Sequence, residues 1–280
     1  MLTTLRLTLC SLLLAAALLA QSQAYQTPLV VTYKQIDTLS LKMNIYLPAA
    51  TSGAVSHPAI IFFFGGGWKG GNISQFQGQA MYFASRGMVA VLADYRVASR
   101  NNTTPFEAVA DAKSAIRYLR KNAAKFHIDP NRIVGAGGSA GGHLAAAADL
   151  TKLEEPQADT TESARPNALV LFNPVLNNGP GEYGYDRIGD RYNEISPFHN
   201  IQKGAAPTIA FFGTSDTLIS VETAKSYETK MKKNGNRFEL YLFPGQSHGF
   251  FNKGIYYEKT LRQADIFLES LAYLSGKPTI

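Results

Sequence analysis

Short apolar runs alternate with helical patterns along most of this 280-residue chain, and the alternation limits the folds it can adopt. The runs are continuous rather than alternating, which is typical of strands buried on both faces of a sheet. Between them, apolar residues recur at helical spacing. This order predicts a doubly wound α/β fold with a mostly parallel sheet. The strands are expected at residues 59–64, 88–93, 133–136, 168–172, 208–212 and 238–243, and the helices at 75–86, 105–119, 140–150, 220–234 and 257–274.

Three other stretches complete a single-domain organisation. Residues 39–47 alternate apolar and polar side chains and, with residues 29–33, predict an antiparallel hairpin at a sheet edge. Residues 153–167 are polar and predict a surface loop. Residues 173–206 are long, rich in Gly, Tyr and Asn, and lie between two core strands. Because connections of this length are usually functional or mobile, we expect a small lid or substrate-binding insertion.

The first 24 residues have the pattern of a secretory signal peptide. Arg6 precedes an apolar run at residues 7–20, and small residues at 22 and 24 suit a signal peptidase. The run is shorter than the about 20 residues of a membrane span, although an uncleaved anchor is the alternative. We therefore predict export to the periplasm or medium, a mature domain at residues 25–280, and no stable membrane association after cleavage. Cys10, the only cysteine, would be lost with the leader, leaving no disulfide.

The composition argues against several classes of partner. Lys and Arg total 27 against 21 Asp and Glu, a formal net charge of +6, but the charges are dispersed. No basic face interleaved with aromatic residues is evident, so nucleic-acid binding is not expected. Neither an H-E-x-x-H motif nor a Cys/His cluster is present, so we predict no metal and no cofactor. The oligomeric state is left open.

A candidate nucleophile lies in the Gly-Gly-Ser-Ala-Gly sequence at residues 137–141. This G-x-S-x-G motif directly follows the predicted strand at 133–136 and precedes the predicted helix at 140–150. A strand–turn–helix setting is what a nucleophile elbow requires, with glycines flanking Ser139 because the tight turn leaves no room for side chains. A phosphate-binding turn at the helix N-terminus is the alternative.

A serine hydroxyl needs a base, and His248 is the best placed of the five histidines. It follows the last predicted strand, at the carboxyl edge where open α/β sheets bind ligands. His57 and His127 fall at the opposite edge, and His143 lies on the same helix as Ser139, where packing or capping is expected. His199, in the 173–206 insertion, is the second candidate for the base.

Asp216 completes the set, because it follows the predicted strand at 208–212. An ordinary helix N-cap is the alternative role. The chain order Ser139, Asp216, His248 is the order of α/β-hydrolase triads. The aspartate would hold the imidazole tautomer and stabilise the imidazolium.

Three glycines at residues 65–67 follow the predicted strand at 59–64 and suit an oxyanion hole. Without side chains, their backbone N–H groups can approach a tetrahedral oxyanion closely. We expect Gly65 and Gly66 to act as donors together with the N–H of Ala140. A flexible glycine loop with no such role is the alternative.

Together these motifs make residues 40–274 similar to bacterial esterases and lipases of the α/β-hydrolase superfamily, and more narrowly to exported carbohydrate esterases of the acetylxylan and feruloyl type. The matching segments are Gly-Gly-Gly-Trp at 65–68, Asp-Tyr-Arg at 94–96, Asp-Pro-Asn-Arg-Ile at 129–133, the motif at 137–144, Ser-Pro at 196–197, Gly-Thr-Ser-Asp at 213–216 and Gly-Gln-Ser-His-Gly-Phe-Phe at 245–251. The resemblance implies the α/β-hydrolase fold. One departure is Phe64, where this family usually has a histidine that orients the glycine loop.

The sequence thus predicts a serine esterase that forms an acyl-enzyme on short-chain or aromatic acyl esters, as small molecules or on plant polysaccharide. Substrate contacts are expected from Trp68 and from three tyrosines of the insertion, Tyr183, Tyr185 and Tyr192, although ordinary packing is the alternative. A peptidase related to prolyl oligopeptidases and a non-catalytic binding protein of the same fold are the competing hypotheses. Activity should rise with pH across the range where histidine titrates, about pH 5 to 8.

Overall fold

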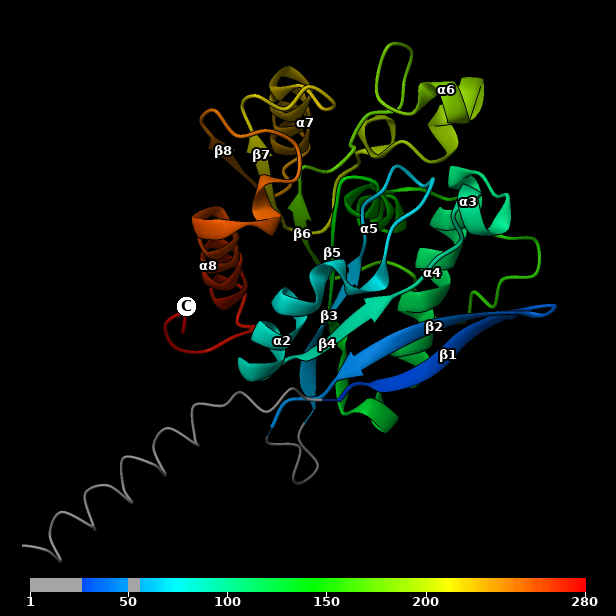
Figure 1. The fold of residues 1–280 in the computed structure, drawn as a ribbon, viewed down its shortest axis with the longest axis vertical. Coiled ribbons are helices and arrows are strands. Elements are labelled where there is room, and N and C mark those ends of the chain that lie inside the picture. Colours follow the sequence, from blue (N-terminus) through cyan, green and yellow to red (C-terminus); the bar gives the residue numbers. More distant parts are fainter. Residues whose placement is uncertain (1–26, 50–55) are drawn as a thin grey trace, which may run out of the picture.

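The protein is described by a computed structural model that covers residues 27–49 and 56–280. The predicted signal peptide at residues 1–24 lies outside these ranges. Eight strands form one sheet in the order β1-β2-β4-β3-β5-β6-β7-β8 (Figure 1). The strands are β1 (Leu29–Ile36), β2 (Leu39–Tyr46), β3 (His57–Phe63), β4 (Val89–Ala93), β5 (Ile128–Gly138), β6 (Ala168–Phe172), β7 (Thr208–Gly213) and β8 (Phe238–Phe243).

The pairing of the strands confirms the predicted sheet. β1 and β2 form the antiparallel hairpin, and β2 continues antiparallel to β4. From β4 to β8 every pair is parallel, so the carboxyl ends of these strands meet at one edge. This is the α/β-hydrolase architecture that the motifs imply, with the hairpin at the sheet edge as predicted.

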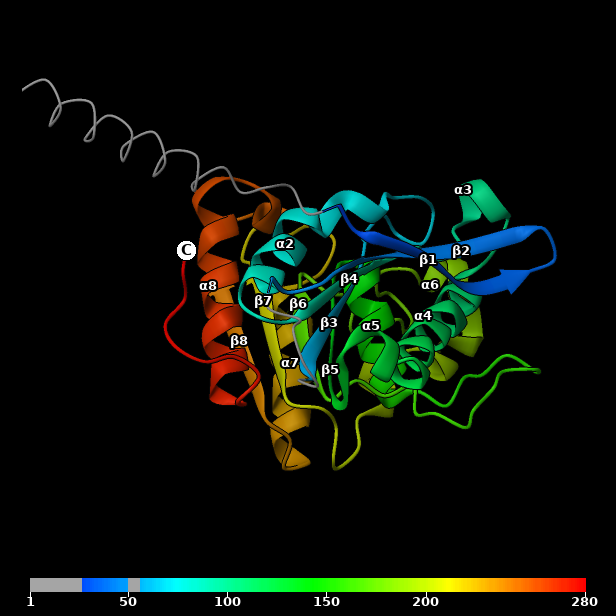
Figure 2. The ribbon, with the colours of Figure 1, turned by 90° about the horizontal axis from the view of Figure 1, so that it is seen from below.

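Helices cover both faces of the sheet, as Figure 2 shows. Consecutive residues of β3 point to opposite faces, so Ile60 and Ile61 belong to two different core clusters. One cluster includes α4, α5 and α7, and the other includes α2 and α8. The helices are α2 (Gln77–Ser85), α3 (Ala98–Asn101), α4 (Pro105–Lys121), α5 (Ala140–Leu150), α6 (Tyr185–Ile188), α7 (Val221–Lys233) and α8 (Gly254–Ser270). Short 3₁₀ helices are η1 (Ile73–Phe76), η2 (Ala124–Phe126), η3 (Gly189–Glu194), η4 (Pro197–Asn200) and η5 (Phe250–Asn252).

The helix caps follow the local sequence. α4 begins with Pro105 and a complete capping box between Thr104 and Glu107. α7 begins at Ser220, whose side chain accepts from the Thr223 N–H. Within the described ranges, no helix combines the length and the apolar composition needed to cross a bilayer.

Two elements, β5 and α8, differ from their predicted bounds by several residues. β5 begins at Ile128 instead of residue 133, because the backbone of residues 127 and 128 pairs with His57 before the register shifts. The Asp-Pro-Asn segment at residues 129–131 is an irregularity in that pairing, with Pro130 and Asn131 exposed, a place where a strand tolerates proline. α8 begins at Gly254 and ends at Ser270, followed by Ala272 with a φ of 61°, which ends the helix before the predicted residue 274.

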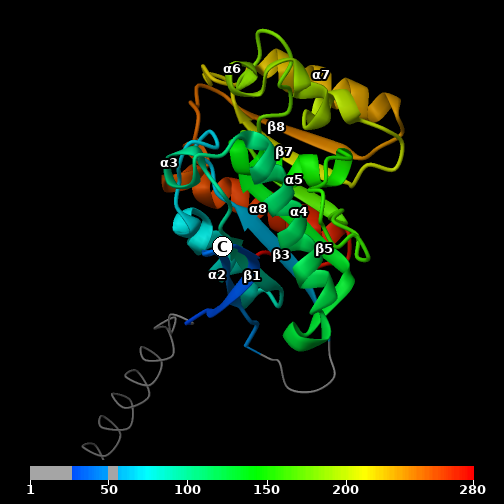
Figure 3. The ribbon, with the colours of Figure 1, turned by 90° about the vertical axis from the view of Figure 1, so that its right-hand side faces the viewer.

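The insertion at 173–206 contains only short helical turns, α6, η3 and η4. Figures 1 and 3 show α6 beyond the carboxyl ends of the central strands, at the end of the molecule that also carries α3. Contacts between the insertion and the loop after β3 fix this position and are described below. The insertion therefore lies at the edge of the sheet where the candidate site residues were predicted.

Candidate active site

Ser139 occupies a sharp turn between β5 and α5. Its φ of 53° and ψ of −120° are rare for a residue with a side chain, and its N–H donates to the Phe172 carbonyl at 2.9 Å. The flanking glycines are required sterically: a Cβ on Gly137 would lie 2.6 Å from the Phe63 carbonyl oxygen, and one on Gly141 would lie 2.0 Å from the same atom. The G-x-S-x-G motif thus forms the predicted strand–turn–helix geometry.

Asp216 and His248 are hydrogen-bonded to each other. The Nδ1 of His248 lies 2.7 Å from the Oδ2 of Asp216, and the other carboxylate oxygen accepts from the N–H groups of Leu218 and Ile219 at 2.8 and 3.1 Å. The carboxylate is fully buried, whereas the imidazole is 23% exposed. Burial alone would raise the pKa of Asp216, but the hydrogen bonds from His248 and these N–H groups outweigh it and lower that pKa. Asp216 is therefore held as an anion beside the imidazole.

Asn173 is a fourth partner of this carboxylate, and sequence reasoning missed it. Its Nδ2 donates to the Oδ2 of Asp216 at 2.6 Å, from a buried position with a φ of 41°. Asparagine tolerates this left-handed backbone better than most residues. The available signal was an Asn-Pro pair directly after the predicted strand at 168–172, at the same carboxyl edge as the other candidates.

The sheet order brings these residues together. Ser139 follows β5, Asn173 follows β6, Asp216 follows β7 and His248 follows β8, and these four strands are neighbours. The loop after β8 crosses back over β5, since a Cβ on Gly138 would meet the Phe251 ring at 2.7 Å. Across the described ranges, no hydrogen bond joins the Ser139 hydroxyl to the His248 imidazole. Such bonds often form only when substrate is bound.

The glycine loop after β3 lies against the serine, because a Cβ on Gly65 would be 3.3 Å from the Ser139 Cβ. Gly66 and Gly67 have φ values of 136° and 62°, which glycine adopts at little cost. The Gly65 N–H donates to Oε1 of the exposed Gln75 at 2.6 Å. Of the expected oxyanion donors, the Gly65 N–H is thus already hydrogen-bonded to Gln75. Ala140 is the first residue of α5, a position where the N–H group has no partner within the helix.

Phe64 performs a packing role in place of the usual histidine. Its buried ring stacks on Tyr95 with centroids 4.1 Å apart and planes 16° apart. The Tyr95 hydroxyl donates to the Phe64 carbonyl at 2.7 Å. The base of the glycine loop is therefore fixed by a stacked ring pair and a hydrogen bond to the backbone.

The structure corrects the expectation that Trp68 contacts substrate. Its side chain is 2% exposed, with its ring edge-to-face with His143 at 5.0 Å, so it is a core residue. Tyr183 lies over the glycine loop, where a Cβ on Gly67 would be 2.8 Å from its hydroxyl. The half-buried Tyr185 and Tyr192 pack together with centroids 6.0 Å apart.

The remaining histidines lie outside the Asp216–His248 pair. The His57 N–H donates to the His127 carbonyl at the amino edge of the sheet, at 2.7 Å. His143 is buried with Nε2 3.0 Å from the Ile195 carbonyl, and burial lowers its pKa to about 4. His199 bonds Ser196 within the insertion at 2.9 Å. His248 is the histidine that meets Asp216.

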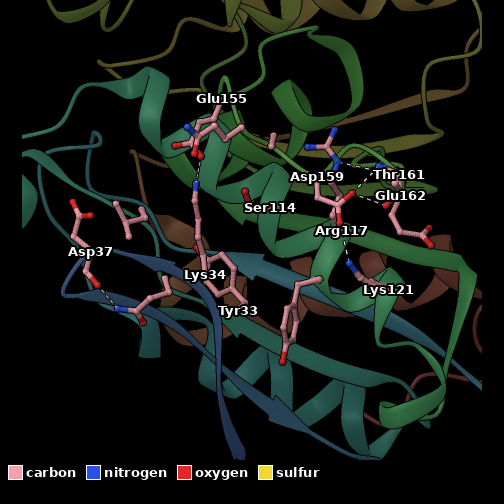
Figure 4. A pocket seen from close by; sticks show the side chains of 15 residues that line it. Tyr33, Lys34, Asp37, Ser114, Arg117, Lys121, Glu155, Asp159, Thr161 and Glu162 are labelled. Atoms are coloured by element: carbon pink, nitrogen blue, oxygen red, sulfur yellow. Dashed lines mark hydrogen bonds and ion pairs between the residues drawn. The ribbon is translucent and has the colours of Figure 1, made fainter.

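A cavity of about 570 Å³ lies away from these residues, between the β1–β2 hairpin, α4 and the 153–167 segment (Figure 4). Two ion pairs join charged side chains of its lining: Lys34 with Glu155 at 2.5 Å and Lys121 with Asp159 at 2.8 Å. The part of the chain that the structure describes also contains no cluster of three His, Cys, Asp or Glu side chains able to hold a metal ion.

Comparison with known proteins supports the same fold and family. The BD-FAE family model matches residues 43–177. Esterase LipC of Mycobacterium tuberculosis is 31% identical over 69% of this chain and 53% of its own, and an acetylxylan esterase of Xylanibacter ruminicola is 26% identical over 83% of this chain and 48% of its own. The chain thus spans about half the length of these curated relatives.

A solved structure covers almost the whole described domain. Esterase 2 of Thermogutta terrifontis superposes with a TM-score of 0.86 at 45% identity, covering 91% of this chain and 96% of that one. The same esterase phosphoramylated by tabun matches at 46% identity with a TM-score of 0.86, covering 92% and 99% of the two chains. The chain therefore belongs to the esterase family of the α/β-hydrolase superfamily that includes Thermogutta terrifontis esterase 2.

Proposed function

We propose that this protein is a serine carboxylic-ester hydrolase with Ser139 as nucleophile, His248 as base and Asp216 as its partner. The observation that carries this proposal is the 2.7 Å bond between His248 and Asp216 on the strand ends next to the Ser139 turn. A related esterase whose solved structures include organophosphate adducts also supports it.

The proposed reaction has two steps. The Ser139 hydroxyl attacks the ester carbonyl while His248 takes its proton and then returns it to the leaving alcohol. Water, deprotonated by the same imidazole, then releases the acid from the acyl-enzyme. Asp216 stabilises the imidazolium that forms in each step.

The oxyanion would be bound by backbone N–H groups of Gly66 and Ala140. The Gly65 N–H becomes available when the exposed Gln75 side chain is displaced from it. Loss of one donor of this kind typically costs about 10² to 10³ in kcat. No metal or cofactor is needed for this chemistry.

The proposed substrates are esters of short or aromatic acids, including those on plant polysaccharide. Structures of the Thermogutta esterase carry propionate and butyrate, which supports short acyl groups. A relative named acetylxylan esterase supports a carbohydrate ester. Tyr183, beside the glycine loop, is the tyrosine best placed to contact the substrate. We further propose export after removal of residues 1–24, which N-terminal sequencing of the mature protein would test.

The test compares wild type, Ser139→Ala and Ser226→Ala on p-nitrophenyl acetate, longer p-nitrophenyl esters, acetylated xylan and proline-containing peptides. Ser226 is an exposed serine on α7 and serves as the matched control. We expect only Ser139→Ala to lose esterase activity and labelling by a fluorophosphonate probe. Unchanged activity of Ser139→Ala would contradict the assignment, and faster cleavage of peptides than of esters would contradict the substrate class.

A further inference from the structure

The glycine loop receives a hydrogen bond from the insertion. The Nη1 of Arg187, on α6, donates to the Gly67 carbonyl at 2.6 Å, although 120 residues separate the two in sequence. The Arg187 side chain is only 19% exposed. Figures 1 and 3 show α6 at the carboxyl end of the sheet, the same end as the loop after β3.

The contact is close packed as well as hydrogen-bonded. The Arg187 guanidinium lies over the rings of Tyr183 and Trp68, 4.8 and 5.4 Å from their centroids. A Cβ on Gly67 would be 3.1 Å from Nη1 of Arg187. A planar guanidinium can stack on rings and donate from its edge at the same time, which a lysine cannot do.

Within the loop, the N–H groups of Lys69 and Gly70 donate to the Gly66 carbonyl, whereas the Gly67 carbonyl is held from outside the loop by Arg187. Gly66 and Gly67 both have positive φ and no side chain, and glycine has more backbone freedom than any other residue. Side chains from three different elements hold its polar groups: Gln75 at Gly65, Tyr95 at Phe64 and Arg187 at Gly67. Arg187 is the one of these three that comes from the insertion.

We propose that Arg187 is a positioning residue of the oxyanion loop: by holding the Gly67 carbonyl it orients the loop N–H groups toward the oxyanion, so that catalysis depends on the insertion being in place. This inference rests on the proposed function. Arg187 acts through the glycine backbone rather than on the substrate. Oxyanion donors act mainly in the transition state, so misplacing them lowers kcat more than it changes KM.

The test compares Arg187→Met and Arg187→Lys with Arg191→Met, a matched control in the same insertion. Arg191 is exposed, pairs with Glu194 and lies over the Phe106 ring, away from the glycine loop. On p-nitrophenyl acetate we expect Arg187→Met to lose about tenfold to hundredfold in kcat, below the about 10² to 10³ of losing a donor outright. KM should change by less than about threefold, and Arg187→Lys should lie between Arg187→Met and wild type.

A second measurement separates positioning from folding. In Arg187→Ala, added guanidinium chloride at millimolar concentration should restore part of kcat, whereas Arg191→Ala should not respond. Thermal unfolding of each variant identifies any that has lost its fold. Two results would overturn the inference. One is an Arg187→Met with the same kcat as Arg191→Met, and the other is a loss of kcat in Arg187→Ala that guanidinium does not restore. An active Ser139→Ala variant would mean that the proposed function itself fails. An inactive Ser139→Ala together with fully active Arg187 variants would mean that only this inference fails.

Discussion

The two sides of Ser139 are built differently. On one side, the loops that follow the neighbouring strands β6, β7 and β8 supply Asn173, Asp216 and His248. On the other side, the glycine loop carries its groups on the backbone and is held by side chains from distant elements. The carboxyl edge of the sheet positions the proposed acid–base groups, whereas the glycine loop is also held by Arg187 of the insertion.

The difference extends to hydrogen bonding. Both Asp216 oxygens accept hydrogen bonds from groups at the carboxyl edge. Buried polar atoms without a partner among the described residues lie on both sides: Asn173 Oδ1 beside Asp216, and Trp68 Nε1, His143 Nδ1 and Asn178 Oδ1 near the glycine loop. With one such atom against three, the side that carries Asp216 has its buried polar groups more fully paired.

The largest expected effect is on the acid–base side. His248→Ala should lower kcat/KM on p-nitrophenyl acetate by about 10⁴ or more, as removal of a triad member does elsewhere. His199→Ala, which removes the second candidate base, should stay near wild type. A large loss in His199→Ala together with a small one in His248→Ala would reverse the assignment.

The next effect concerns pH and the oxyanion side. Burial lowers the pKa of His143 to about 4. As the pH falls, the unfolded chain therefore binds a proton at this residue near pH 6.5, whereas the folded protein binds it only near pH 4. The free energy of unfolding should therefore fall as pH drops from about 6.5 to about 4. The loss is about 3 kcal/mol, because each pH unit between the two pKa values is worth about 1.4 kcal/mol. Urea unfolding from pH 7.5 to 4 checks this, and His143→Gln should show a flatter dependence.

Asn173 offers an intermediate effect on the acid–base side. Asn173→Gly keeps the positive φ accessible but removes the bond to Asp216, which should cost about tenfold to hundredfold in kcat/KM, since hydrogen bonds to charged groups are worth about 1.5–3 kcal/mol. Asn173→Asp should instead move the fall of activity at acid pH to higher pH, because two neighbouring carboxylates raise the pKa of the Asp216 carboxyl. Identical pH profiles for the two variants would show that Asn173 does not act through Asp216.

The smallest effect tests the base of the glycine loop. Tyr95→Phe removes the bond to the Phe64 carbonyl but keeps the ring stack, and should lower the free energy of unfolding by about 1–2 kcal/mol. A several-fold fall in kcat with little change in KM should accompany it. Tyr118→Phe, on the outer part of α4, is the control for loss of a tyrosine hydroxyl. An unchanged kcat would mean that Phe64 packing alone fixes the loop.

Much of the fold and most of the acid–base side were readable from the sequence. Apolar runs separated by helical patterns predicted the sheet, and polar residues directly after those runs predicted Ser139, Asp216 and the pairing of Asp216 with His248. This worked because parallel strands bring their carboxyl ends to one edge whatever the details of packing. The start of α4 was predictable for a different reason, because a capping box depends only on residues that are close together in the sequence.

Other features were decided only by the tertiary structure. Trp68 could not be identified as a core residue, since its burial depends on His143 and Tyr183 from other segments. The bonds of Arg187 to Gly67 and of Gln75 to Gly65 leave no pattern in the sequence, because no periodicity or spacing rule links the partners. Local sequence determined which groups stand at the strand ends, and long-range packing decided how the glycine loop between them is held.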